Sequence, residues 1–294
     1  MATLTSLIRK IVEKGPDGLV EAGRRRSREG MARAIVALLR RVPVRMLLAV
    51  KTSLSPVVRL DYEGDEILLQ ANSEFDLMRA QGCSKEPHTV RWIENHVRAG
   101  DVFYDIGANV GAYAMVAARQ APGQVVSHAF EPSYSTYNSL CNNVILNGYQ
   151  NQVFPHLIAL GEENGRSVLN YHSLVAGTAL HAVGSNVSFQ NKTFDPVYRQ
   201  QIFVFSLDDL VLNWGFEMPT HMKIDVDGTE LDVLLGARKI LGDPQLRTVL
   251  VEVCHDRGHA EDIHELMTAS GFVVESEVYL QPTVSNRVYT RETD

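Results

Sequence analysis

The segment FYDIGANVGAYAMVAA, residues 103–118, places an acid, two glycines and an asparagine between apolar residues and a run rich in alanine. The apolar residues before Asp105 predict a buried strand, and the small residues after Gly111 predict a helix packed on a sheet. Gly107 and Gly111 lie in the turn between them, where a missing side chain lets a ligand approach the backbone. A strand, a glycine-bearing turn and the N-terminus of a helix form a general site for nucleotide cofactors.

The side chains around this turn discriminate between cofactors. A dinucleotide site has its second glycine at the position of Asn109, where the pyrophosphate approaches the backbone. Asp105 comes shortly before Gly107, and its negative charge would repel a pyrophosphate. A carboxylate suits a cationic cofactor instead, and S-adenosylmethionine carries a sulfonium and an ammonium group. The turn therefore favours S-adenosylmethionine over NAD.

A second acid stands where a ribose-binding residue is expected. In dinucleotide sites an acid about 20 residues after the glycine turn ends the second strand and binds ribose hydroxyls. The segment VVSHAFEPS, residues 125–133, supplies Glu131 at this place. A carboxylate can accept hydrogen bonds from both hydroxyls of a ribose. We interpret Glu131 as the ribose-binding residue; the alternative is a charge that merely ends a strand.

Strands and helices alternate from residue 101 onward. The predicted strands span residues 102–106, 125–130, 153–160, 221–226 and 248–253. The predicted helices span residues 112–119, 135–147, 229–241 and 260–270. Two later runs, 273–280 and 287–290, add an antiparallel edge. This alternation predicts an α/β fold with a doubly wound, mostly parallel seven-stranded sheet and helices on both faces.

Two segments fall outside this alternation. Residues 161–205 contain scattered glycine, asparagine and serine among short β-like pieces, and we expect an insertion or lid there within a domain of residues 57–294. Residues 1–56 predict a basic helical extension. The first 60 residues hold 13 Lys and Arg against 4 Asp and Glu, while the rest of the chain is acidic. This arm either pairs with the acidic body or contacts an anionic membrane surface or nucleic acid.

The composition excludes several classes of protein. With 45% hydrophobic and 21% charged residues, the 294-residue chain is typical of globular proteins. It has no run of about 18 uncharged apolar residues, so we expect no membrane-spanning helix. Three widely spaced cysteines, Cys83, Cys141 and Cys254, argue against a disulfide framework or a zinc cluster. We therefore expect a cytoplasmic protein.

Five segments together resemble the FkbM-type methyltransferases. They are DVFYDIGANVG, AFEPS, LCNNVILNG, SLDDL and MKIDVDGTELDVLLGA, and their order and spacing carry the resemblance from about Trp92 to about Glu252. Members of this family are class I S-adenosylmethionine-dependent enzymes, and many methylate hydroxyls of sugars or natural products. The resemblance implies a Rossmann-like class I fold and an S-adenosylmethionine-dependent O-methyltransferase. Where the family often has glutamate, this chain has Asp227.

The resemblance implies a role for each matching position. The cofactor would be held by the first turn and the end of the second strand, through Asp105, Gly107, Asn109, Gly111 and Glu131. Asn143, in the helix after the second strand, would lie near the cofactor edge; an equal alternative places it on the polar face of that helix. From topology alone, and not from a motif, Ala159 at the end of the third predicted strand would lie near the adenine.

A further group of ionisable residues lies in KIDVDGTE, residues 223–230. Lys223, Asp225 and Asp227 alternate with apolar residues at the end of a predicted strand, and such groups are costly to bury unless they are paired or used. Ligands of open α/β sheets bind at this edge. We expect Asp225 to be the catalytic base that takes the proton of an acceptor hydroxyl. Lys223 would pair with it or steer the acceptor, and the alternative is a structural network of ion pairs.

Carboxylates at neighbouring strand ends also raise the alternative of a metal site. Asp225, Asp227 and Glu252 could meet there as oxygen ligands for Mg²⁺. Such an ion would lower the pKa of the acceptor hydroxyl. Our primary prediction has no metal.

Three functions compete for this sequence. We favour an enzyme that methylates a hydroxyl on a small molecule. A nucleic-acid methyltransferase using the basic arm is the second hypothesis, but the acidic body offers a poor track for phosphates, so we expect no nucleic-acid partner. A catalytically silent binding module is the third, and the joint presence of Asp105, Gly107 and Glu131 argues against it.

Overall fold

The computed structural model describes residues 30–31, 33–37, 39, 42–54, 56–178, 181–184 and 193–291. The chain divides into two compact units, residues 1–55 and 56–294. The first unit contains helix α3 (Val44–Ser53), which begins directly after Pro43. The predicted helical extension also includes residues 1–29, which lie outside the described residues. No helix in the described part of the chain is long and apolar enough to cross a membrane.

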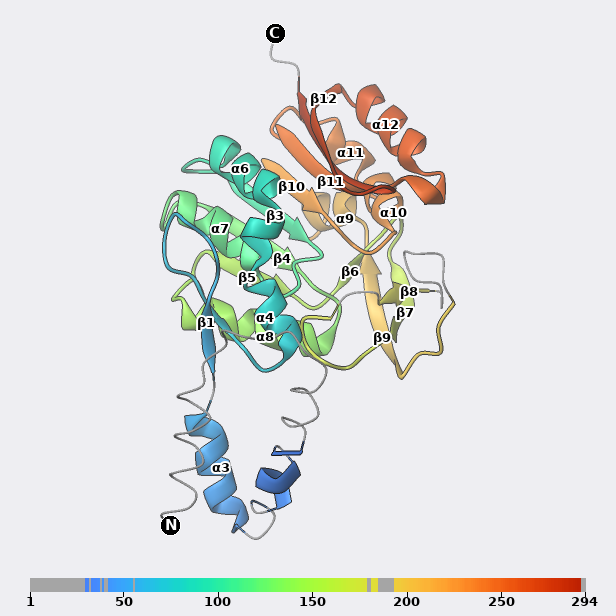
Figure 1. Cartoon of the computed structure of the whole chain (residues 1–294). Helices are drawn as coiled ribbons and strands as arrows, with labels where there is room; N and C mark the ends of the chain where they lie inside the picture. Colours follow the sequence, from blue (N-terminus) through green and yellow to red (C-terminus); the bar gives the residue numbers. More distant parts are fainter. Residues whose placement is uncertain are drawn as a thin grey trace. The chain divides into compact units, whose positions relative to one another are not determined.

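The second unit is built around a sheet of seven strands in the order β12-β13-β11-β10-β3-β4-β5 (Figure 1). Their bounds are β3 (Val102–Ile106), β4 (Val126–Phe130), β5 (Val153–His156), β10 (His221–Ile224), β11 (Thr248–Cys254), β12 (Phe272–Gln281) and β13 (Val284–Arg291). β13 is antiparallel to both neighbours, and the other strands run in one direction. The predicted Rossmann-like, mostly parallel seven-stranded sheet is confirmed.

Helices cover both faces of this sheet. One apolar layer packs the sheet against α6 (Pro87–His96), α7 (Ala112–Gln120) and α8 (Tyr134–Leu146). The other layer packs it against α9 (Leu207–Leu212), α10 (Glu230–Leu235), α11 (Arg238–Leu241) and α12 (Ala260–Ala269). Along β3, Phe103 belongs to the first layer whereas Tyr104 and Ile106 belong to the second. Alternate side chains of the strand therefore pack into the two apolar layers on opposite faces of the sheet.

The chain order of the strands reverses between β3 and β10. From β3 the sheet grows one way through β4 and β5, and from β10 it grows the other way through β11. A reversal of this kind leaves a crevice at the carboxyl ends of the two strands, where ligands of open α/β sheets bind.

Two predicted elements are wrong in extent. The strand predicted over 153–160 splits into β5 and β6 (Ala159–Leu160), because β6 leaves the central sheet and pairs with β9. The helix predicted over 229–241 breaks into α10 and α11. The chain at Gly236 approaches other backbone there, since an added Cβ would lie 2.1 Å from the carbonyl oxygen of Gly161.

A second sheet has the order β6-β9-β7-β8, with β7 (Gly165–Tyr171), β8 (Ala182–Val183) and β9 (Tyr198–Phe205). It has its own small apolar cluster around Leu169 and Tyr171. The hydroxyl of Tyr171 accepts a hydrogen bond from the backbone N–H of Tyr134, and the Gln200 amide donates to the carbonyl of Pro132. These bonds attach the second sheet to the turn that follows β4.

A small N-terminal part of the second unit lies beside α8. It consists of the hairpin β1 (Val57–Arg59) and β2 (Leu68–Gln70), followed by α4 (Glu74–Arg79) and α5 (Gly82–Lys85). The Asn147 amide accepts from the N–H of Leu68 and donates to its carbonyl, as a neighbouring strand would. Ser73 caps α4 by accepting from the N–H of Asp76. The hairpin and its contacts thereby hold α4 near the carboxyl edge of the central sheet.

Candidate active site

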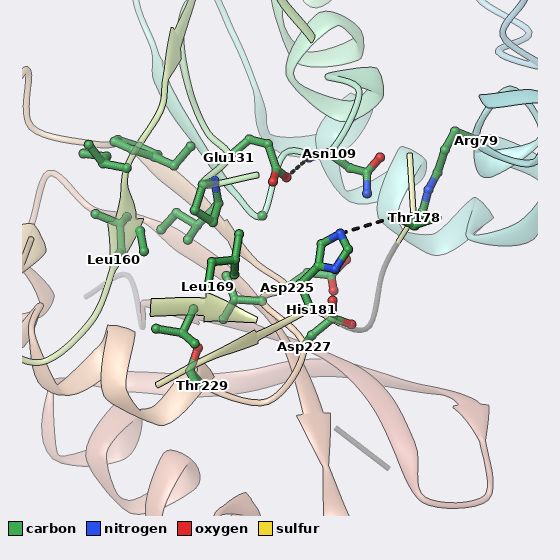
Figure 2. Close-up of a pocket in the computed structure, with 18 residues that line it drawn as sticks. Arg79, Asn109, Glu131, Leu160, Leu169, Thr178, His181, Asp225, Asp227 and Thr229 are labelled. Atoms are coloured by element: carbon green, nitrogen blue, oxygen red, sulfur yellow. Dashed lines mark hydrogen bonds between the residues drawn. The ribbon is translucent and has the colours of Figure 1, made fainter. Parts of the chain in front are cut away.

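A pocket lies at the carboxyl ends of β3, β4 and β10, with an empty volume of about 800 Å³ including its opening to solvent (Figure 2). Its floor comes from the three strand ends. One wall is apolar and contains Phe130, Ile158 and Leu160. β7 contributes Leu169, and the chain just before β8 contributes His181. The pocket therefore occupies the crevice predicted by the reversal of strand order.

The turn after β3 packs directly against the end of β10. Gly107 has a φ of +80°, and a Cβ on it would lie 1.8 Å from the carbonyl oxygen of Asp225. The N–H groups of Gly107 and Ala108 both donate to the carbonyl of Phe130 at 3.0 Å. Asn109 follows with a φ of +50°, which asparagine tolerates better than most residues. Its Oδ1 is buried without a hydrogen-bond partner among the described residues.

Glu131 joins the turn after β3 to the turn after β4. Its Oε2 accepts from the N–H of Asn109 at 3.0 Å, and its Oε1 accepts from the N–H of Ser133 at 2.8 Å. Burial raises the pKa of Glu131 to about 7, although the two N–H groups and Arg79 act in the opposite direction. A carboxylate has about four acceptor positions, so two stay available on the pocket side.

Lys223 and two acids form a buried charged group beneath the pocket. Its Nζ lies 2.9 Å from Oδ2 of Asp225 and 3.8 Å from Oδ1 of Asp105. Burial by itself opposes ionisation of both Lys223 and Asp225, but their mutual attraction raises the pKa of Lys223 and lowers that of Asp225. Asp225 lines the pocket, whereas Lys223 does not, so the amine acts on the pocket through the carboxylate.

The loop after β10 is held from behind by Glu230. Its Oε1 accepts from the N–H of Gly228 at 2.9 Å and from that of Val226 at 3.2 Å. Burial raises the pKa of Glu230 to about 7. Within this loop Asp227 has a φ of +57°. Asp227 in the loop after β10 and Asn109 in the turn after β3 are therefore both non-glycine residues with a positive φ. Such conformations persist where the surrounding structure enforces them and are frequent at functional sites.

The predicted site residues fall into two groups. Those that line the pocket are Gly107, Asn109, Glu131, Ala159 and Asp225. Four others lie behind its wall, namely Asp105, Gly111, Asn143 and Lys223. Asp105 is fully buried and its Oδ2 accepts from the N–H of Ala114 in α7.

Gly111 and Asn143 hold the turn after β3 in place. Gly111 precedes α7, and a Cβ on it would lie 2.3 Å from Cδ1 of Leu140. The amide of Asn143 donates to the carbonyl of Val110 and accepts from the N–H of Gln70, so it ties the turn to the hairpin. The structure places both residues one layer below the pocket surface.

The alternative Mg²⁺ site is not supported. In the described part of the chain, no group of three or more His, Cys, Asp or Glu side chains is arranged to hold a metal ion. Asp225 and Asp227 both line the pocket, but Glu252 does not. The Lys223 ammonium, 2.9 Å from Asp225, already supplies a positive charge where the cation was predicted.

Four polar lining residues were not predicted as site residues: Arg79, Thr178, His181 and Thr229 (Figure 2). Thr229 lies within residues 223–230, where only the ionisable residues were singled out. Arg79 is a single arginine on the short helix α4, outside every motif that we singled out. Thr178 and His181 come from the segment predicted as an insertion, which carries no motif. Burial lowers the pKa of His181 to about 4, so its ring is neutral at pH 7. No sequence pattern marks Arg79, Thr178 or His181, and only the folded chain shows that they line the pocket.

The Methyltransferase FkbM domain family matches residues 105–274 of this chain. The matched region contains the turn after β3, Glu131 and the loop after β10. The chain belongs to the FkbM methyltransferase family. The predicted family is confirmed, and the chain is an S-adenosylmethionine-dependent methyltransferase.

Two relatives of this FkbM-family chain are named for different substrates. The 31-O-demethyl-FK506 methyltransferase FkbM of Streptomyces tacrolimicus is 27% identical in an alignment of 221 residues, and the match covers 67% of this chain and 84% of the relative. The hexuronic acid methyltransferase AglP of Haloferax volcanii is 25% identical over 214 residues, 73% of this chain and 80% of the relative. A solved S-adenosylmethionine-dependent methyltransferase from Agrobacterium tumefaciens has a TM-score of 0.48 and 10% identity, covering 81% of this chain and 71% of that one.

Proposed function

We propose that this protein transfers a methyl group from S-adenosylmethionine to a hydroxyl of a small molecule, a sugar or a natural product. The observation that carries the proposal is the position of Asp225, which lies 2.9 Å from the Lys223 ammonium and lines the same pocket as Glu131. The relatives give further support, since one is named for O-methylation of a natural product and another for methylation of a hexuronic acid.

The pocket residues fit the parts of this cofactor. Glu131 has two acceptor positions left for the ribose hydroxyls. The apolar wall at Phe130 and Leu160, together with Ala159, suits the adenine. The unpartnered Oδ1 of Asn109 suits an ammonium donor. When bound, the cofactor supplies a methyl group on a positively charged sulfur.

Asp105, Gly111 and Asn143 would support the cofactor from behind the wall. Asp105 fixes the N-terminus of α7 through the N–H of Ala114, and its Oδ1 lies 3.8 Å from the Lys223 ammonium. Gly111 leaves room for Leu140, and Asn143 holds Val110. We propose that these three residues keep the turn in the shape that binds the cofactor, without touching it.

Asp225 would accept the proton of the acceptor hydroxyl. Lys223 keeps this carboxylate ionised and fixes its orientation through the 2.9 Å contact. A low pKa makes Asp225 a weak base, but the hydroxyl of the acceptor becomes strongly acidic as its oxygen forms a third bond, to the methyl carbon, and gains positive charge while the bond between that carbon and sulfur breaks. A weak base in hydrogen-bond reach is then sufficient. Lys223 is a positioning residue in this proposal.

The proposal is tested by replacing Asp225 with asparagine. We expect Asp225→Asn to bind S-adenosylmethionine as the wild type does and to lose methyl transfer by roughly a hundredfold or more, the range typical of a lost general base. The assay is radiolabelled methyl transfer to a panel of sugars and hydroxylated natural products. Asp262→Asn, an exposed acid in α12, is the matched control and should keep full activity. Normal turnover by Asp225→Asn would remove it as the base.

A further inference from the structure

Arg79 presents most of its hydrogen-bonding capacity to the pocket. It stands at the last position of α4 and lines the pocket wall. Its Nε donates to the carbonyl of Gly177 at 3.0 Å. No other hydrogen bond or ion pair joins its guanidinium to the described residues. The two terminal NH₂ groups therefore have their donors available for a ligand.

A close contact between two segments holds Arg79 in this position. Ser73, which caps α4, donates from its hydroxyl to the carbonyl of Ala176 at 3.1 Å. A Cβ on Gly177 would lie 2.9 Å from Oδ1 of Asp76, so the loop fits closely on the helix. We call this contact between α4 and residues 176–178 the clasp. It bounds the pocket at one end, where Arg79 and Thr178 both belong to the lining.

Arg79 is the cation of an otherwise acidic pocket. The charged groups that line the pocket are Glu131, Asp225, Asp227 and Arg79, and among the described lining residues only Arg79 is positive at pH 7. Its charge offsets part of the rise that burial gives to the pKa of Glu131, and it adds to the effect of Lys223 in lowering the pKa of Asp225. An arginine among acids offers a specific place for a carboxylate ligand.

The polar groups follow one another along the pocket in a definite order. Figure 2 shows Leu160 at one end, Glu131 between, and Asn109 with Arg79 at the other end. S-adenosylmethionine has the same order of chemistry, with an apolar adenine, a ribose with two hydroxyls and an amino acid that carries an ammonium and a carboxylate. Asn109 offers an acceptor, and Arg79 offers paired donors, at the end that corresponds to the amino acid.

We infer that Arg79 binds the carboxylate of the methionine part of S-adenosylmethionine. The inference rests on the proposed cofactor site and adds a residue from outside the matched family region, residues 105–274. The planar guanidinium can form two parallel hydrogen bonds to one carboxylate, an arrangement that lysine cannot reproduce. The clasp orients this group, because the Nε contact with Gly177 leaves the other nitrogens to the ligand.

Calorimetric titrations with two ligands test the inference on the full-length chain. S-adenosylmethionine has the carboxylate, and decarboxylated S-adenosylmethionine lacks it but keeps the adenine, ribose, sulfonium and amine. We expect Arg79→Ala to weaken binding of the first ligand roughly 10- to 100-fold, the effect of losing charged hydrogen bonds. Binding of the decarboxylated ligand should change by less than about twofold. The affinity of Arg79→Lys for S-adenosylmethionine should lie between those of the wild type and Arg79→Ala, because lysine keeps the charge but cannot form two parallel hydrogen bonds to one carboxylate.

Arg59→Ala is the matched control. It removes an exposed arginine of β1 that does not line the pocket, so the ratio of the two affinities should stay at the wild-type value. An unchanged ratio in Arg79→Ala would overturn the inference, whether both affinities fall together or neither falls. Arg79 would then only support the clasp or bind a carboxylate of the acceptor. If the wild type binds neither ligand, the proposed cofactor is wrong, which is a different outcome.

Discussion

Gly107 and Asp225 touch backbone to backbone: a Cβ on Gly107 would lie 1.8 Å from the carbonyl oxygen of Asp225. The contact joins the turn after β3 to the loop after β10, at the point where the strand order reverses. One of the two residues belongs to the predicted cofactor turn and the other is the proposed base. Their separation is therefore fixed by packing of the main chain and not by flexible side chains.

Gly107→Ala should abolish cofactor binding and lower the free energy of unfolding by about 3 kcal/mol or more, because the new methyl group meets backbone that cannot move aside. Gly123→Ala is the matched control. Gly123 has a similar φ of +75° but open space around it, so its cost should be only the ~1–2 kcal/mol of the left-handed conformation. Urea unfolding and calorimetry measure the two effects. Equal destabilisation by both variants would show that the contact with Asp225 contributes nothing.

Affinity for S-adenosylmethionine should fall as the pH drops below about 7. The free pocket holds Glu131 with a pKa of about 7, and ribose hydroxyls donate stronger hydrogen bonds to its ionised form than to its protonated form. Binding therefore lowers this pKa and releases a proton, so affinity rises with pH up to about 7 and then levels off. Below that value we expect a loss of up to roughly tenfold per pH unit.

Two glutamine variants show whether Glu131 or Glu230 causes this pH dependence of the affinity. Glu131→Gln should bind the cofactor more weakly and without the pH slope. Glu230 also has a pKa of about 7 but lies behind the loop, so Glu230→Gln should keep the slope. The measurement is calorimetric affinity across neutral pH. A slope that survives in Glu131→Gln and disappears in Glu230→Gln would assign the titration to the wrong acid.

Lys223→Met should lower the free energy of unfolding by about 3–5 kcal/mol at neutral pH, since it leaves the carboxylates of Asp105 and Asp225 without their shared cation. The loss should shrink as the pH is lowered, because protonation removes the unpaired charges. Lys239→Met, at an exposed position of α11, should change the stability by less than about 0.5 kcal/mol. Urea unfolding gives both values, and equal stability of the two variants would refute a structural role for the ion pairs.

Methyl transfer should be insensitive to chelators. Among the described residues, no three His, Cys, Asp or Glu side chains are arranged to hold a metal ion, and Lys223 pairs with Asp225 where Mg²⁺ was the alternative. Activity after treatment with EDTA should equal that of the untreated protein, and added Mg²⁺ should not raise it. Loss of activity in EDTA with recovery in Mg²⁺ would contradict this prediction.

The sequence predicts the central sheet well because its strands are short apolar runs bounded by turn residues. Gly107 and Glu131 could be found for the same reason, since each follows such a run. For Asp105, the place in the motif does not tell on which side of the sheet the carboxylate lies. Asp105 has the same parity along β3 as Phe103, which packs towards the layer of α6–α8, so its carboxylate points under α7 and away from the pocket.

Other parts of the site depend on contacts distant in sequence. Apolar residues such as Ala159 and Leu160 fit a strand that continues β5 as well as a strand that pairs with β9. The sequence could not distinguish the two arrangements, so the predicted strand was too long. Arg79 reaches the pocket because α4 packs on residues 176–178, almost 100 positions later in the chain. No local pattern marks an arginine whose partner is provided by another segment.

The central claim is that this pocket binds S-adenosylmethionine, and titration calorimetry of the full-length chain with this cofactor tests it most directly. The account predicts saturable binding at one site per chain and no binding of NAD under the same conditions. It also predicts that Glu131→Ala weakens the cofactor affinity by roughly tenfold or more. No heat of binding with S-adenosylmethionine at millimolar concentration, or binding of NAD in its place, would contradict the account.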